Sequence, residues 1–122
     1  MIIKEVTPVV LKEYDVTVAP YLTYSQIQNI VNNVNQFTEW AERETIIDAM
    51  VVCYAAGISM EEFEKYGHDK LLCCGFIDAV KNHVKNLKLV YKAVAFNESL
   101  GRTINKALEM VPELANRLEE TK

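Results

Sequence analysis

The chain has 122 residues, a mass of 13.9 kDa and a formal net charge of −4, with half of its residues apolar and a quarter charged. This length fits one domain, and this composition excludes an intrinsically disordered or fibrous chain. No apolar run reaches the roughly 18 residues that a membrane-spanning helix needs, so we expect no membrane partner.

The cysteines and the first residues indicate the compartment. Cys53, Cys73 and Cys74 are odd in number and lie among apolar neighbours, which favours reduced and buried thiols over disulfides. The first residues are charged where a signal peptide would have an apolar core. We therefore expect synthesis in the cytosol.

Residues 1–22 differ from the rest of the chain because β-branched side chains dominate them, while Pro8 and Pro20 prevent a continuous helix. This pattern predicts an extended arm with one or two short strands. Pro8 is unsuited to the centre of a sheet, and an isolated two-stranded ribbon is only marginally stable in water. The arm must therefore lie over the protein's own core or pair with another chain, and the sequence leaves both alternatives open.

Two longer helices are predicted next. Thr23 and Gln26 form a capping-box pattern that opens a helix over 24–36. Thr38 is a suitable cap for a second helix, which Gly57 ends. The apolar face of this second helix consists of Trp40, Ile47, Met50, Val51 and Tyr54. We expect this face to be the centre of the core.

Shorter helical units follow. Ser59 and Glu62 form a second capping box for a helix over 60–66, and Asp69 can cap the next helix. The pattern is then helical from about residue 70 almost to 111, and we expect a bend or split at Gly75, at Gly101 or at both. A final short helix starts at Pro112.

A seven-residue rhythm marks this second half. Its apolar positions, which we name the apolar stripe, are Ile77, Val80, Val84, Leu87, Tyr91 and Val94. Basic residues repeat beside them, and this basic stripe, our candidate interaction surface, consists of Lys81, Lys85, Lys88, Lys92, Arg102 and Lys106. Three-and-four spacing places each set on one side of a helix. The basic stripe is a solvated face, a surface for an acidic neighbour or a contact for nucleic acid.

The sequence contains no pattern typical of a catalytic or metal site. His68, Cys73 and Cys74 lie within seven residues, but adjacent cysteines on a helix point about 100 degrees apart, which does not suit zinc. No glycine-rich phosphate loop, nucleophile elbow or metalloprotease motif occurs. We therefore expect no catalytic residues, no metal ligands and no cofactor, and we interpret the chain as a non-enzyme.

Three short motifs carry a family resemblance. They are Tyr21-Leu22-Thr23-Tyr24-x-x-Ile27-x-x-Ile30-Val31, Thr38-Glu39-Trp40-x-Glu42-Arg43 and Gly67-His68-Asp69. Together with the valine-rich arm and the long Lys/Asn-rich helix, they resemble small proteins encoded in the structural gene clusters of tailed bacteriophages. The resemblance implies a setting in virion morphogenesis, at the head–tail junction, in the tail or in an assembly factor. It supplies no catalytic residues.

The sequence thus predicts an all-α fold, a small helical bundle with an extended or β-stranded N-terminal arm (1–22) joined to a helical domain (23–122). The expected function is that of a non-enzymatic phage virion structural or assembly protein, located in the virion or the host cytoplasm. Its expected partners are other copies of itself and other virion proteins. The alternative is a small phage-encoded regulator or inhibitor that binds a host protein or nucleic acid.

Overall fold

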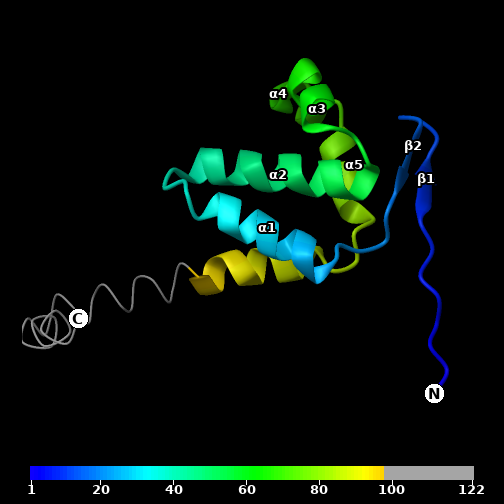
Figure 1. The fold of residues 1–122 in the computed structure, drawn as a ribbon. Coiled ribbons are helices and arrows are strands. Elements are labelled where there is room, and N and C mark those ends of the chain that lie inside the picture. The colour runs from blue at the N-terminus through cyan, green and yellow to red at the C-terminus, as the bar shows by residue number, and fades with distance from the viewer. Residues whose placement is uncertain (98–122) are drawn as a thin grey trace, which may run out of the picture.

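The computed structural model describes residues 1–97, which are mostly helical with a short two-stranded antiparallel sheet near the N-terminus (Figure 1). The strands are β1 (Val9–Leu11) and β2 (Val16–Val18). The helices are α1 (Tyr24–Val34), α2 (Trp40–Ala56), α3 (Met60–Tyr66), α4 (His68–Cys73) and α5 (Phe76–Asn82). Residues 87–97 are also helical. No helix in this part of the chain is long and apolar enough to cross a membrane.

The predicted arm divides into two parts. Its second part is a hairpin in which Val9 pairs with Val18 and Leu11 with Val16. Val18 is fully buried, and the amide of Ala19 donates a 2.8 Å hydrogen bond to a carbonyl near the end of α2, so the hairpin packs on the protein's own core. Residues 1–8, which precede β1, have no regular structure, and all eight are exposed (Figure 1). From here on, the arm means residues 1–8.

Local capping chemistry sets the ends of α1. The Thr23 side chain accepts a hydrogen bond from the amide of Gln26, and the Gln26 side chain accepts one from the amide of Thr23, as the capping box predicts. At the other end, the guanidinium of Arg43 donates to the carbonyls of Val34 and Phe37, at 3.3 and 2.7 Å. These bonds join the last residue of α1 and the loop after it to the first turn of α2.

The predicted start of α2 is wrong in two respects. Glu39 is the N-cap and makes no side-chain capping bond, so Thr38 does not cap this helix. Trp40 is 77% exposed and does not belong to the core, because it is the first residue of α2. The end of the helix is as predicted, since Gly57 adopts a left-handed conformation with φ of 69°.

The short helices follow the sequence closely. The Ser59 hydroxyl accepts a bond from the amide of Glu62, and α3 spans Met60–Tyr66 as predicted. Gly67, with φ of 86°, is the N-cap of α4, so the expected cap at Asp69 is wrong by two residues. Gly75 has φ of 88° and separates α4 from α5, which confirms the predicted split there.

A second break lies at residues 83–86, where the sequence pattern predicted a continuous helix. The side chain of Asn86 accepts a 2.9 Å bond from the amide of Leu22 and donates a 2.8 Å bond to its carbonyl. The amide of Lys85 donates to the carbonyl of Pro20 at 2.8 Å. These bonds turn the chain away from α5 and also fix the segment that connects the hairpin to α1.

The apolar stripe is nevertheless inside the protein. Ile77 and Val80 on α5, Val84 in the turn and Val94 in the last helical stretch are all buried, while Leu87 and Tyr91 are partly buried. Val90, which lies outside the predicted stripe, is also fully buried. The rhythm therefore identified core positions correctly, although two helices and a turn carry them.

Candidate functional site

The residues of the basic stripe differ in their exposure to solvent. Lys85, Lys88 and Lys92 are exposed, as an interaction surface requires. Lys81 instead points into the protein, where its side chain is 17% exposed and its ammonium is paired. Arg102 and Lys106 lie outside the described residues. The described part of the candidate surface therefore consists of Lys85, Lys88 and Lys92.

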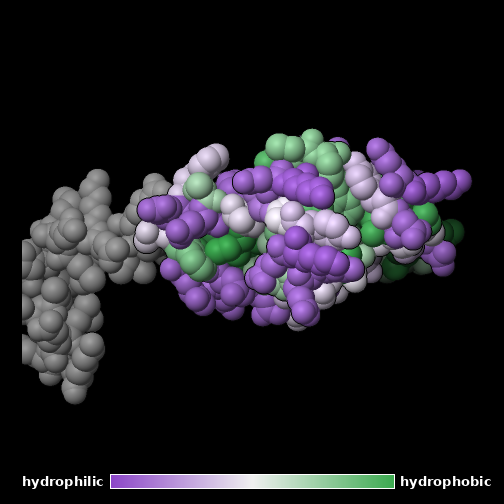
Figure 2. Space-filling model, turned by 90° about the horizontal axis from the view of Figure 1, so that it is seen from above, coloured by the Kyte–Doolittle hydropathy of each residue, from purple (hydrophilic) through white to green (hydrophobic). Residues whose placement is uncertain are grey.

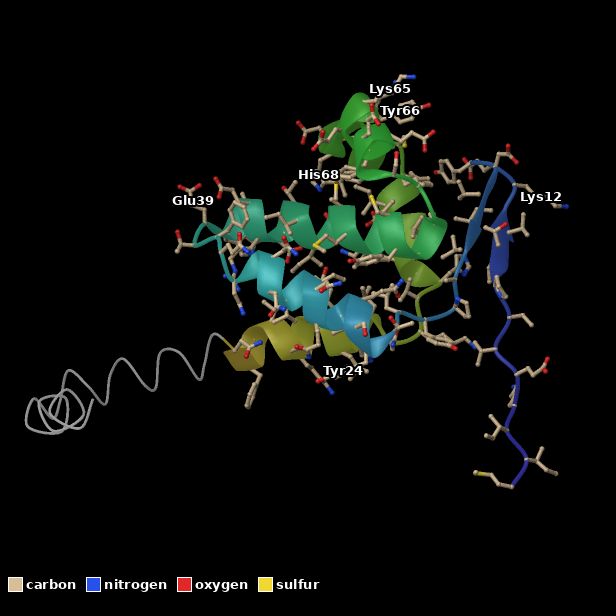
Figure 3. All side chains as sticks on the ribbon, in the orientation of Figure 1. Lys12, Tyr24, Glu39, Lys65, Tyr66 and His68 are labelled. Carbon is tan, nitrogen blue, oxygen red and sulfur yellow. The ribbon has the colours of Figure 1, made fainter. Side chains whose placement is uncertain are left out.

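Lys81 belongs to a buried polar cluster centred on Asp48. Its Nζ donates 2.7 Å hydrogen bonds to Oδ1 of Asp48 and to the hydroxyl of Tyr91. The second carboxylate oxygen, Oδ2, lies 2.9 Å from Nε2 of His68. Figure 3 shows His68 between α4 and α2. The cluster thus joins α2, α4, α5 and the helical stretch 87–97.

The electrostatics of the cluster favour a protonated Lys81. Burial lowers the pKa of Lys81, but the hydrogen bonds to Asp48 and Tyr91 outweigh this effect and hold the pKa above its ordinary value of 10.5. Burial also raises the pKa of Tyr91, against the opposing effect of Lys81. A charged ammonium therefore remains opposite the carboxylate throughout the neutral range.

This arrangement is suited to holding helices together. Both carboxylate oxygens of Asp48 have hydrogen-bond partners. None of the four side chains of the cluster lines the cavity between the hairpin and the short helices. Asp48 is the only charged residue in the apolar segment 46–56, and a lone charge in such a run is the sequence signal that could have revealed the cluster. Its partners could not be identified from the sequence because Lys81 lies 33 residues away.

Several large apolar side chains of the N-terminal segment are exposed to solvent. Ile2, Ile3 and Val6 are 101%, 75% and 40% exposed, and Val10 on β1 is 61% exposed. In Figure 2, hydrophobic side chains lie at the end of the molecule that carries the arm, beside a mostly hydrophilic face. Large apolar side chains gathered on an extended segment are typical of an interaction site rather than of a solvated terminus.

A cavity of about 640 Å³ lies between the hairpin and the short helices. One wall comes from the hairpin loop and β2, and the other from the end of α2 and from α3, α4 and the start of α5. The lining residues are Tyr14, Asp15, Val16, Thr17, Ala56, Gly57, Ile58, Glu62, Tyr66, Lys70, Leu71, Cys74 and Phe76. Two of these lining residues are bonded to each other, since the Tyr14 hydroxyl donates a 3.0 Å bond to the carbonyl of Cys74.

The cysteines differ from the expectation of three buried thiols. Cys53 is partly buried, and burial raises the pKa of its thiol. Cys73 and Cys74 are exposed, because they are the last residue and the C-cap of α4 and face outward. Among residues 1–97, no three His, Cys, Asp or Glu side chains converge as metal ligands would.

Comparison with protein-family models, with curated proteins and with solved structures finds no match to this chain.

Proposed function

We propose that this chain is a non-enzymatic structural or assembly protein of a tailed-phage virion, a small helical bundle that joins copies of itself through its N-terminal arm. The observation that carries this proposal is the exposed segment of residues 1–8, which presents the large apolar side chains of Ile2, Ile3 and Val6 to solvent. The virion setting comes from the sequence resemblance. The head–tail junction, the tail and an assembly factor are the positions that suit it.

The arm has a firmly anchored base. The amide of Ala19 donates a hydrogen bond to α2, and the carbonyl of Pro20 accepts one from the amide of Lys85. The backbone of Leu22 exchanges two hydrogen bonds with the side chain of Asn86. An extended segment that leaves such a base is presented in a defined direction, which lowers the entropic cost of binding a neighbour. This geometry favours an arm that exchanges between copies.

The energies are consistent with reciprocal exchange. Burying Ile2, Ile3 and Val6 gives roughly 1.5–3 kcal/mol for each side chain. Association costs about 4–15 kcal/mol, so a single arm gives little net affinity. Two arms exchanged in a dimer double the gain to roughly 9–18 kcal/mol against a single association cost. We therefore expect a closed homo-oligomer.

The exposed Lys85, Lys88 and Lys92 supply a second contact surface. Their charge suits an acidic face on another virion protein, and such a contact weakens with salt.

Light scattering at several protein concentrations tests the proposal. We expect the mass of a defined multiple of the 13.9 kDa chain, and we expect the protein to associate with portal or tail proteins encoded beside it. A monomer at every concentration contradicts self-assembly.

The exposed lysines also favour the second candidate, a small regulator that binds a host protein or nucleic acid. A monomer that retards nucleic acid, with an affinity that falls steeply as salt rises, supports this alternative over the assembly protein.

A further inference from the structure

The cavity beside the hairpin follows an open strand edge. Consecutive side chains of a strand point to opposite faces of a sheet. Val16 and Thr17 are consecutive residues of β2 and both line the cavity, as does Asp15 in the hairpin loop, whereas no residue of β1 does. The cavity therefore lies along the edge of β2 that is opposite β1. Within residues 1–97 the sheet has two strands, so this edge has no strand neighbour there, and the amide of Ala19, just after β2, bonds to α2.

The lining combines apolar walls with charged rims. Val16, Ile58, Leu71 and Phe76 provide apolar surface, and a volume of about 640 Å³ is within the range of pockets that enclose most of a small ligand. An extended peptide of a few residues can therefore enter. Such a peptide can add to a strand edge through its backbone while its apolar side chains fill the cavity.

Charge complements the arm. Asp15 and Glu62 are acidic and Lys70 is basic among the cavity residues, while the exposed arm has Lys4 and Glu5 between its apolar side chains. The cavity residues therefore carry one net negative charge. Lys4 of an inserted arm can pair with Asp15 or Glu62, and Glu5 can pair with Lys70.

The arm points away from the cavity of its own chain. The cavity is lined by the hairpin loop, at the end of β1 where Leu11 lies. Residues 1–8 leave from the opposite end and run away from the loop (Figure 1). A chain would have to reverse its own arm to fill its own cavity, whereas a neighbouring copy can insert its arm directly.

We propose that residues 2–6 of one copy bind in this cavity of a second copy, as a third strand along β2. This inference rests on the proposed self-assembly and names its contact. Apolar side chains of the arm lie against Val16, Ile58 and Phe76 of the other copy, and Lys4 lies near its acidic rim.

The chain contains a natural reporter for this contact, because Cys74 is exposed and lines the cavity, while the neighbouring Cys73 is exposed and does not line it. The full-length protein with Cys73→Ser receives a new cysteine by Ile2→Cys or, separately, by Ile3→Cys. A thiol oxidant such as copper phenanthroline is then added. We expect at least one variant to form a disulfide between copies, mapped to Cys74 by mass spectrometry and absent after Cys74→Ser.

Three results overturn the inference. A dimer that persists after Cys74→Ser shows that the arm meets another arm or Cys53 instead, and mass spectrometry distinguishes the two. A disulfide to a cysteine placed by Val10→Cys, with none to Cys74, places the arm along β1 and leaves self-assembly intact. A disulfide to Cys74 within a monomer shows that the arm folds back on its own chain. Failure of the proposed function differs from all of these, because the unmodified protein is then monomeric by light scattering.

Discussion

The ammonium of Lys81 donates a 2.7 Å hydrogen bond to the carboxylate of Asp48, which is buried in the core on α2. His68 and Tyr91 complete this contact, so one buried carboxylate connects four helical segments. A buried ion pair adds little net stability compared with apolar residues, but removing one partner leaves an uncompensated charge.

Lys81→Met should therefore lower the free energy of unfolding by about 3–5 kcal/mol, because Asp48 stays buried without its cation. Urea unfolding followed by circular dichroism measures this loss. The matched control is Lys85→Met on an exposed lysine, which should change stability by less than about 0.5 kcal/mol. Equal effects of the two substitutions would show that the cluster does not stabilise the fold.

Stability should fall at alkaline pH through the same cluster. The pKa of Lys81 is raised above 10.5 and that of Tyr91 above 10.0, so the folded state holds these protons more tightly than the unfolded state does. Their contribution is complete below about pH 10 and is lost as pH rises through the folded-state pKa values. Urea midpoints between pH 8 and 11 should fall more steeply for the unmodified protein than for Lys81→Met. Parallel slopes would refute this assignment.

Asn86→Ala tests the turn that ends α5. The substitution removes two hydrogen bonds to the backbone of Leu22, so it should cost about 1–3 kcal/mol. Asn82→Ala, at an exposed position four residues earlier, is the control and should be nearly neutral. Thermal unfolding compares them, and equal melting temperatures would argue against a role for Asn86 at the turn.

Local chemistry made much of the fold predictable. The capping residues Thr23 and Ser59 and the glycines Gly57 and Gly75 act within a few residues of their own positions, and each marks a helix boundary as predicted. Burial of the apolar stripe was also predictable, because periodicity reports a buried face regardless of its partner.

The remaining features depend on contacts across the chain. The break at residues 83–86 follows from Asn86, whose side chain bonds to a segment 64 residues earlier. Lys81 has the spacing of an exposed lysine, and only the position of Asp48 directs it inward. The arm was predicted as a segment, but the sequence could not show that its hairpin packs on the core while residues 1–8 are exposed.

The apolar side chains of residues 1–8 should hold copies of the chain together. The most direct test of this contact is sedimentation equilibrium of the triple variant Ile2→Ser, Ile3→Ser and Val6→Ser beside a control with Lys12→Ser and Glu13→Ser in the hairpin loop. Both variants keep Val18 and the hairpin, so both should retain the helical circular dichroism of the unmodified protein. The triple variant should sediment as a 13.9 kDa monomer while the control keeps the multimer mass. A triple variant that keeps the multimer mass would contradict the role of the arm.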